Sequence, residues 1–496
     1  MKKIHCAERP DWKHTAESLG FMFHTIDDEP YWDESAYYQF TLAQIENDLE
    51  DPTTELHEMC MDLVDRVVHS EELLDRLSIP SAYYDMIRTS WREGHPHLYG
   101  RMDFSYNGNG PAKLLELNYD TPTSLYEAAA FQWGWLEQCI ERGTLPSHAD
   151  QFNSIDTKLH QAFAELQLKR PFYFASMKDS VEDKGTTDYL RLIAEKVGIE
   201  SRHIDIEDIG LTAEGRFVDL EDRWIPHLFK LHAWEFIFHE PFGAAIAECD
   251  TQFFEPAWKA ILSNKGALPL LWELHKGHPN LLAAHLDPDP ASAVPKGWVR
   301  KPFFSREGAN IELQTTDGLI VKENGPYTDA PFILQEFAPL PKFGESYTLI
   351  GSWVIGDQAA GIGVREDNSL ITKDSSRFLP QLLQSIGVIS DSSTQKRPVA
   401  SSDGPFYLQR LQQQIRTEYR HQSCRNPEPV AVRPAVEPEP NAAVEPTAAG
   451  AEPADVALER TAGSCCHRLV GRPVVGGRRA VAWCLACRPR FQWCNA

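Results

Sequence analysis

The chain has 496 residues, more than the roughly 100–200 of an ordinary compact domain, so two to four lobes are expected. Hydrophobic residues at 42%, aromatic residues at 10% and charged residues at 24% exclude a wholly disordered, collagenous or coiled-coil chain. The net charge of −24 is uneven: residues 1–382 carry −28, which disfavours nucleic acid and anionic membranes and suits divalent metals or cationic partners, whereas residues 383–496 carry +4.

The N-terminal segment gives no sign of export. Lys2 and Lys3 are not followed by an apolar run, so no secretory signal is predicted. No apolar run anywhere reaches the roughly 20 residues that span a bilayer. Four cysteines spread thinly through residues 1–382 indicate reduced, isolated thiols. We therefore expect a cytoplasmic protein.

The first long elements are a helix pair and a hairpin. Helical spacing over 36–78 predicts two scaffold helices that end near Pro80. Two alternating runs over 97–118 flank the turn cluster NGNGP at 107–111, which predicts an antiparallel hairpin. A turn centred between 109 and 110 pairs position 103 with 116 and position 101 with 118. The hairpin then has one polar face, with Arg101, Asp103, Glu116 and Asn118, and one apolar face, with Met102, Phe104, Leu115 and Leu117.

The polar face of the hairpin has two possible roles. Two carboxylates and one amide oxygen are the hard ligands that Mg²⁺ takes while it keeps water and substrate phosphates in its other positions. Arg101 beside them can hold a phosphoryl oxygen and stabilise charge as it is transferred. The alternative is a solvent-exposed hairpin with an ordinary Arg–Glu pair, and the spacing alone favours neither.

The sequence from residue 124 to residue 366 predicts a helix and two further lobes. A helix with Ser124 as its N-cap is expected to run to about 142, where Gly143 stops it. Strands and helices alternate over 171–249, which is typical of an α/β lobe. Five strands with little helix between them are expected near 298–304, 318–322, 332–338, 346–356 and 358–366. These strands predict an antiparallel α+β lobe.

Nucleotide-binding signals are weak when taken singly. The chain has no Gly-Lys dipeptide and hence no Walker A loop, and the GIG at 361–363 lacks the third glycine of a dinucleotide fingerprint. Lys301 ends a predicted strand, and the turn up to Gly308 can direct cations and backbone N–H groups at a polyphosphate, although a basic hairpin turn is commoner. Lys265 and Gln335 alone read as ordinary surface or edge residues.

Seven motifs carry a family resemblance. They are ERPDW at 8–12, EPYW at 29–32, LELNYDTPTSLYE at 115–127, SVEDKGT at 180–186, KPFFSREGAN at 301–310, LPKFG at 340–344 and GIGVRED at 361–367, followed by SRF at 376–378. In this order they resemble the glutathionylspermidine synthase family, in particular its stand-alone ATP-grasp-like acid–amine ligases. The resemblance covers about 1–382 and implies α/β and α+β lobes, an ATP-grasp-like fold and a pre-ATP-grasp lobe.

The resemblance also implies a site. Asp103, Glu116 and Asn118 are implied to hold two Mg²⁺ ions, with Arg101 as the transition-state stabiliser. ATP is implied to lie against Arg101, Met102, Asp103, Lys265, Lys301, Arg306, Gly308, Gln335, Arg365, Leu370, Ile371 and Thr372. The acid substrate is implied to touch the loop 120–124, through Thr121 and Thr123, and we place the amine near Glu182 and Asp183.

The implied activity is an ATP- and Mg²⁺-dependent acid–amine ligase that forms an amide through an acyl phosphate. Its substrates would be a small-molecule or peptide carboxylic acid and an amine, with polyamines among the candidates. Thr121 and Thr123 replace serines of the family's acid-binding loop, so glutathione is not assumed, and the amidase domain of bifunctional members has no counterpart. The alternative is an ATP-binding or ATPase module that senses or holds a partner without ligation.

Residues 383–496 are expected to form a tail outside the ligase. Pro, Ala and Glu dominate 426–457, a low-complexity stretch that predicts disorder. The CCH at 465–467 and the CLAC at 484–487 can be read as zinc ligands. Thirteen arginines to one lysine are more typical of out-of-frame translation of G+C-rich DNA, and we favour an appended tail over a zinc module.

Overall fold

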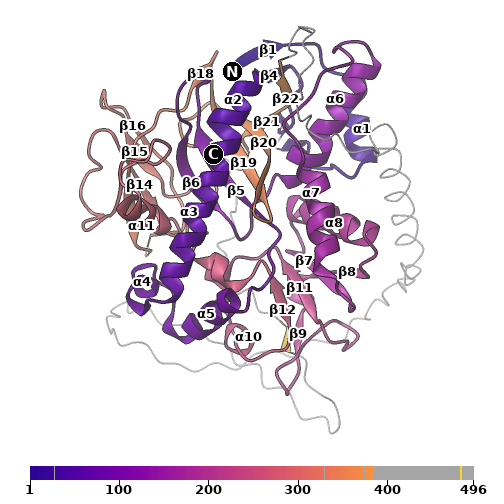
Figure 1. The fold of residues 1–496 in the computed structure, drawn as a ribbon, viewed down its shortest axis with the longest axis vertical. Helices are drawn as coiled ribbons and strands as arrows, with labels where there is room; N and C mark the ends of the chain where they lie inside the picture. The colour runs from indigo at the N-terminus through magenta and orange to yellow at the C-terminus, as the bar shows by residue number, and fades with distance from the viewer. Residues whose placement is uncertain (27, 329, 374, 385–480, 483–496) are drawn as a thin grey trace, which may run out of the picture. The chain divides into compact units, whose positions relative to one another are not determined.

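The computed structural model describes residues 1–384, apart from 27, 329 and 374, and residues 481–482. Three larger sheets organise this part of the chain (Figure 1). The predicted low-complexity stretch and the two cysteine motifs at 465–467 and 484–487 lie outside the described residues. Among the described helices, none has both the length and the apolarity needed to cross a bilayer.

A six-stranded antiparallel sheet forms the centre of the fold. Its strands are β5 (Tyr99–Ser105), β6 (Lys113–Asn118), β18 (Lys342–Phe343), β19 (Ser346–Ile355), β20 (Gln358–Asp367) and β21 (Arg377–Leu379). They follow the order β21-β20-β19-β5-β6, with β18 pairing β19. Helix α3 (Asp51–Val68) packs on β19 and β20, and the π-helix η3 (Glu127–Phe131) and α7 (Ile155–Leu166) also contact this sheet.

The β5–β6 hairpin keeps the predicted pairing of its polar residues. Arg101 pairs with Asn118 and Asp103 with Glu116, but a bulge follows Asp103, so Phe104 pairs with Leu114. A bulge sets two residues of one strand against one of the other, which reverses the facing of residues beyond it. The apolar face therefore uses Leu114, which is fully buried, and the prediction of Leu115 there is wrong.

A five-stranded antiparallel sheet forms a second lobe, which holds three of the five strands predicted for the α+β lobe, those near 298–304, 318–322 and 332–338. The other two, near 346–356 and 358–366, are β19 and β20 of the central sheet, so the prediction that all five share one lobe is wrong. Its strands are β13 (Ala284–Leu286), β14 (Trp298–Pro302), β15 (Glu312–Gln314), β16 (Ile320–Lys322) and β17 (Phe332–Glu336). The order is β13-β17-β14-β15-β16, and α11 (Ala267–Leu274) packs against β13. The prediction missed β13 and β15, which have three residues each and too little periodicity to detect.

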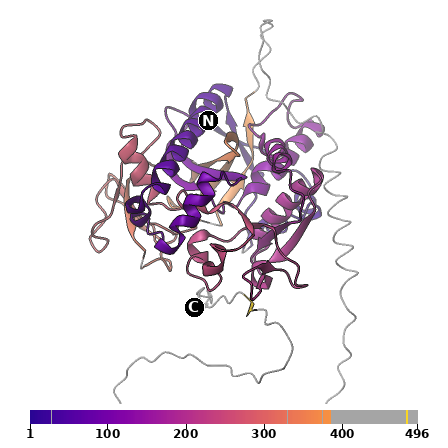
Figure 2. The ribbon, with the colours of Figure 1, turned by 60° about the horizontal axis from the view of Figure 1, so that its bottom comes forward.

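A four-stranded parallel sheet forms the predicted α/β lobe. It contains β7 (Phe172–Ser176), β8 (Ser201–Asp205), β11 (His227–Lys230) and β12 (Gln252–Phe254), in the order β12-β11-β7-β8, with α8 (Val181–Lys196) between β7 and β8. The smaller elements of this part are η4 (Ile206–Asp208), β9 (Gly210–Leu211), β10 (Phe217–Val218), α9 (Trp234–Ile237), α10 (Gly243–Ile246), η5 (Ala257–Ala260) and β23 (Val481–Ala482), which pairs β9. The five-stranded and parallel sheets lie on opposite sides of the central sheet in both views (Figure 1, Figure 2).

A three-stranded sheet brings together the first and the last strand of residues 1–384. Strand β1 (Lys2–His5) and strand β22 (Gln381–Leu383) both pair with β4 (Ala36–Phe40). Residues 36–40 were predicted as helix, but their burial alternates, which a strand requires. The remaining elements here are α1 (Trp12–Ser18), β2 (Thr25–Ile26), β3 (Glu29–Pro30), α2 (Leu42–Ile45), η1 (Glu46–Glu50), α4 (Glu71–Arg76), η2 (Ser81–Tyr83), α5 (Tyr84–Arg92) and α6 (Gln132–Glu141).

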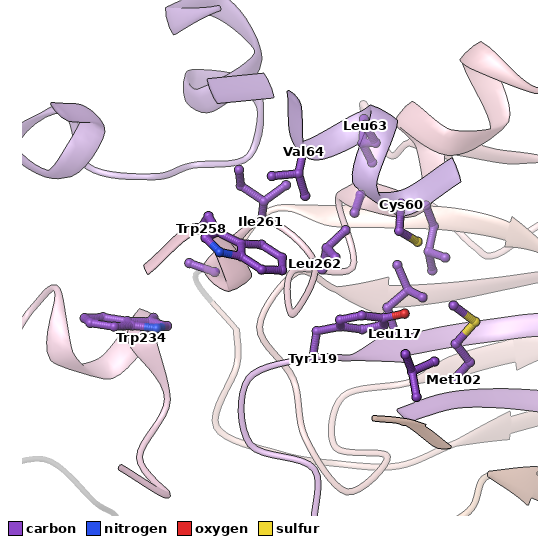
Figure 3. Packing of buried hydrophobic residues seen from close by; sticks show 14 of the residues in the cluster. Cys60, Leu63, Val64, Met102, Leu117, Tyr119, Trp234, Trp258, Ile261 and Leu262 are labelled. Carbon is purple, nitrogen blue, oxygen red and sulfur yellow. The ribbon is translucent and has the colours of Figure 1, made fainter. Parts of the chain in front are cut away.

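The core lies on both faces of the central sheet. Met102 of β5 belongs to the cluster under α3, whereas Tyr99 and Trp353 belong to a second cluster with η3 and α7. Figure 3 shows part of the first cluster, with side chains of α3, of the hairpin and of the segment after η5: Cys60, Leu63, Val64, Met102, Leu117, Ile261 and Leu262. Burying each such side chain stabilises the fold by about 1.5–3 kcal/mol, which holds the hairpin rigid behind its polar face.

Candidate active site

A cavity of about 240 Å³ opens on the polar face of the β5–β6 hairpin. The predicted site residues that line it are Arg101, Asp103, Glu116, Asn118, Thr121, Thr123, Glu182, Asp183, Lys265, Arg306, Gly308, Arg365 and Thr372. These residues come from the central sheet, from the start of α8, and from the loops after β6, before α11, after β14 and after β20. The fold therefore brings together residues that are up to 271 positions apart in the chain.

Arg101 and Asp103 form a buried ion pair at one side of the cavity. The Nε and Nη2 atoms of Arg101 donate to the two carboxylate oxygens of Asp103 at 2.6 and 3.0 Å, and Nη1 donates to the carbonyl of Thr123 at 2.8 Å. Arg365 donates to Asp103 from the opposite side at 2.9 Å. The fully buried carboxylate of Asp103 is therefore paired with two guanidinium groups through charge-assisted hydrogen bonds.

Glu116 and Asn118 complete the polar face. The Nδ2 atom of Asn118 lies 3.4 Å from Asp103 and 3.2 Å from Glu116, and Lys265 lies 3.4 Å from Glu116. Burial alone would raise the pKa of Glu116, but Lys265 and Lys301 outweigh it and hold that pKa well below its usual range. Glu116 is therefore an anion at neutral pH.

The donor chemistry of these residues fits Mg²⁺. The side-chain amide of Asn118 lies within hydrogen-bond distance of both carboxylates, and carboxylate and amide oxygens are ligands that Mg²⁺ prefers. In the described part of the chain, no group of three or more His, Cys, Asp and Glu side chains has metal-binding geometry. A cation held by Asp103 and Glu116 would take the Oδ1 oxygen of Asn118 as its third protein ligand.

Five predicted ATP-binding residues lie outside the lining of the cavity. Met102 is buried in the core on the opposite face of β5. Lys301 donates to Gln335 and to the carbonyl of Leu115, both at 2.8 Å, and its burial lowers its pKa to about 8 despite the charge of Glu116. Leu370 and Ile371 belong to a small apolar cluster with Val299 and Leu313 of the five-stranded sheet.

The loop after β6 is held by a buried ion pair. Lys230 donates to Asp120 at 2.6 Å, and the other oxygen of that carboxylate accepts from the backbone N–H of Trp234 at 2.8 Å. The exposed fraction is 1% for the Lys230 side chain and 0% for that of Asp120. This pair fixes the loop 120–124 against the parallel lobe. Ser124 precedes the helix as predicted, but with φ 68° instead of the extended backbone of an N-cap.

The start of α8 makes one end of the cavity acidic. The Ser180 hydroxyl accepts from the N–H of Asp183 at 3.2 Å, which caps the helix and presents Glu182 and Asp183 to the cavity. Burial, the charge of Glu127 and the charge of Asp183 raise the pKa of Glu182 to about 8. Such an environment favours a bound cation over an anion.

Glu182→Gln should flatten the pH dependence of stability between pH 4.5 and about 8. In this window the folded protein binds the Glu182 proton and the unfolded chain does not, so stability falls as pH rises, by at most about 1.4 kcal/mol per pH unit. Urea denaturation of both proteins across this range measures the slope. Glu58→Gln, on the exposed face of α3, should keep the original slope, and an equal slope in Glu182→Gln would contradict the assignment.

The loop 303–310 closes another side of the cavity. Arg306 donates to Thr121 at 2.7 Å and to Glu235 of α9 at 2.6 Å. Gly308 has φ 73°, and a Cβ there would lie 2.8 Å from the carbonyl of Thr372, so glycine is needed. Further lining residues were not predicted: Ser180, Leu231, His232, Ala233, Phe236, Ser305, Glu307, Leu349 and Lys373. Most lie in segments with no recognisable motif.

Comparisons with known proteins give the family to which the sequence is similar. The family model described as glutathionylspermidine synthase preATP-grasp matches residues 3–384. A Haemophilus influenzae protein, provisionally named an acid–amine ligase, is 39% identical over 386 residues, which cover 75% of this chain and 96% of that protein.

Two longer proteins also occur among the relatives. Trypanothione synthetase of Crithidia fasciculata is 30% identical over 353 residues, which cover 66% of this chain and 53% of that protein. The bifunctional glutathionylspermidine synthetase/amidase of Escherichia coli is 26% identical over 386 residues, which cover 72% of this chain and 60% of that protein. The chain thus spans little more than half of each.

Proposed function

Because the chain belongs to the glutathionylspermidine synthase family, as its motifs predicted, we propose that it is an ATP- and Mg²⁺-dependent ligase that joins a carboxylic acid to an amine. The ATP-grasp-like fold class that the resemblance implied is confirmed. The observation that carries the proposal is the set of Arg101, Asp103, Glu116 and Asn118 on one face of a rigid hairpin. We assign the ligase domain to residues 1–382, with 383–496 as an appendage.

The phosphate end of the site is the polar face of the hairpin. Asp103, Glu116 and Asn118 would hold Mg²⁺, with two ions as the family resemblance implies. When bound, the metal neutralises charge on the transferring phosphoryl group. Arg101 would then direct its guanidinium at that group, and Lys265 would bind a neighbouring phosphate. Because Arg101 contacts both Asp103 and the carbonyl of Thr123, it would lie between the proposed metal ligands and the acid substrate.

The purine end of ATP is assigned to the five-stranded sheet. Val299, Leu313 and Ile371 form an apolar cluster there, with Leu370 packed against it. A purine ring needs apolar walls and a few polar groups at its edge. Gln335 of β17 supplies a polar group near this cluster and is held by Lys301.

The substrate end of the cavity separates the acid from the amine. Thr121 and Thr123 would hold the carboxylic acid, and Glu182 and Asp183 would hold the positive charge of the amine. The carboxylate oxygen attacks the γ-phosphorus of ATP, the bond to ADP breaks, and an acyl phosphate forms. The amine nitrogen then attacks the acyl carbon, and inorganic phosphate leaves.

An acid screen with hydroxylamine tests the proposed function without knowledge of the natural amine. Hydroxylamine is largely uncharged at neutral pH and traps acyl phosphates as hydroxamates. The protein, ATP, Mg²⁺ and hydroxylamine are incubated with a panel of peptides, amino acids and other carboxylic acids, and mass spectrometry detects the hydroxamate. An acid-dependent hydroxamate supports ligation. ATP hydrolysis that stays the same across the whole panel would favour a module that only binds or hydrolyses ATP.

Glu116→Gln should raise the Mg²⁺ concentration needed for half-maximal hydroxamate formation by about 10–100-fold, because one charged ligand becomes neutral. A Mg²⁺ titration of the trapping reaction measures this change. Glu312→Gln is the matched control, since Glu312 pairs with Lys322 at the surface of the five-stranded sheet. An unchanged Mg²⁺ requirement in Glu116→Gln would remove Glu116 from the ligand set.

We also place the reaction in the cytoplasm. Cys6, Cys60, Cys139 and Cys249 are all free thiols, which are typical of a reducing compartment. The cytoplasm supplies ATP, and the acidic end of the cavity suits cationic amines such as polyamines.

A further inference from the structure

A chain of hydrogen bonds leads from the cavity into the core. Ser124 lines the cavity, and its hydroxyl lies 3.5 Å from the Oη atom of Tyr31, the outer limit of a hydrogen bond. Tyr31 donates its only hydrogen to the Oε1 atom of Glu127 at 2.6 Å. Ser124 must therefore donate to Tyr31, so both bonds point from the cavity towards Glu127.

Glu127, at the inner end of these hydrogen bonds, has an unusual environment. Its side chain is fully buried, and its Oε2 atom has no hydrogen-bond partner among the described residues. Burial raises the pKa of Glu127, although Tyr31 and Arg101 oppose the rise. A buried carboxylate with one unpaired oxygen is costly to maintain and gains by taking up a proton.

The backbone around these groups is also irregular. Ser124 takes φ 68°, a conformation that few residues other than glycine adopt, and the π-helix η3 begins at Glu127. Strained residues and π-helical turns concentrate at functional sites. These features set the Ser124 hydroxyl in the cavity wall and the Glu127 carboxyl behind it.

We propose that Ser124, Tyr31 and Glu127 form a proton relay that deprotonates the attacking amine, an inference that rests on the proposed function. The bound ammonium first passes one proton to Ser124, which frees the electron pair of its nitrogen. This pair then attacks the acyl carbon, the bond to phosphate breaks, and the departing phosphate takes the second N–H proton. The Ser124 proton passes to Tyr31, and the Tyr31 proton passes to Glu127. Burial and the charge of Glu127 keep the pKa of Tyr31 well above its ordinary value, so the phenolate does not accumulate and the transfers occur together.

Other charged groups surround Glu127, and one of them, Glu182, is a competing acceptor for the ammonium proton. Arg101 and Arg365 favour the carboxylate form of Glu127, whereas Glu182 opposes it. Glu182 faces the same cavity and could accept the proton directly. Its place beside Asp183 suits it better to balance the charge of the bound amine, whereas Glu127 takes the proton out of the cavity.

The test compares two nucleophiles with Tyr31→Phe. The acid that gives the most hydroxamate with the unaltered protein is used, first with hydroxylamine and then with a protonated primary amine that this protein accepts, starting with spermidine. We expect Tyr31→Phe to form amide about 100-fold more slowly with the amine, and hydroxamate at a rate within about twofold of the unaltered protein. The deficit with the amine should shrink as pH rises, because the free amine fraction grows about tenfold per pH unit.

Three further variants keep the inference testable. Glu127→Gln retains the acceptor of the Tyr31 bond but takes up no proton, so it should reproduce the Tyr31→Phe pattern if that variant folds poorly. Tyr37→Phe removes a hydroxyl on β4 and should leave both reactions unchanged. Equal losses with both nucleophiles in Tyr31→Phe and Glu127→Gln would mean a structural role for these residues. A loss selective for the amine that occurs in Glu182→Gln alone would assign the proton to Glu182. Either result overturns the relay. Absence of hydroxamate from the unaltered protein would overturn the proposed function itself.

Discussion

Arg101→Ala should lower acyl-phosphate formation by about 1000-fold or more, while ATP still binds. The guanidinium of Arg101 contacts both Asp103, a proposed metal ligand, and the carbonyl of Thr123 in the proposed acid loop. Arg101 is only 7% exposed, and its guanidinium carbon lies 5.7 Å from the centre of the Trp353 ring. In such a buried setting, water that entered after the substitution would stabilise a negative charge much less than the guanidinium does. The charge that develops on the transferring group would lose this stabilisation.

Two measurements separate the role of Arg101 in catalysis from a role in binding. Hydroxamate formation reports the chemical step, and equilibrium dialysis with a non-hydrolysable ATP analogue reports nucleotide affinity. Arg101→Lys keeps the charge without the two-pronged contact to Asp103 and should recover only part of the rate. Arg66→Ala, which removes an exposed pair with Asp62 on α3, should leave the rate unchanged. ADP release at the original rate from Arg101→Ala would refute its assigned role.

The hairpin was predictable because its information is local. Strict alternation on two short strands around a turn cluster allows one register with a clean apolar face, and the structure has Arg101 opposite Asn118 and Asp103 opposite Glu116. The bulge after Asp103 was not predictable, because nothing in the alternation marks one extra residue. It changes only the far end of the strand, away from the polar face.

The rest of the cavity depends on contacts between distant segments. Tyr31 and Glu127 are 96 positions apart, and Asp120 and Lys230 are 110 apart. No periodicity links such pairs, and a buried lysine or glutamate looks in the sequence like a surface one. His232 and Phe236 likewise reach the cavity only because β11 ends beside the loop 120–124. The family resemblance therefore supplied most of the residues proposed to bind, whereas tertiary contacts revealed the groups that hold them.

Lys230→Met should destabilise the protein by about 3–5 kcal/mol. The methionine keeps most of the side-chain volume over the Trp234 ring, from which the Lys230 ammonium lies 4.3 Å. It leaves Asp120 as a fully buried carboxylate whose remaining partner is the N–H of Trp234. Removing one member of a buried ion pair costs more than removing both, because the other charge stays in a medium that cannot solvate it.

Urea denaturation of a matched series tests this argument. Lys230→Met combined with Asp120→Asn removes both charges and should regain a large part of the loss, which a simple packing defect at position 230 would not allow. Lys322→Met breaks the surface pair with Glu312 and should cost less than about 1 kcal/mol. If Lys230→Met were no more destabilising than Lys322→Met, the pair would not be the anchor of the loop. If the pair does anchor the loop, Lys230→Met should also lower the rate of hydroxamate formation, because the Asp120 carboxylate fixes Thr121 and Thr123 in the cavity wall.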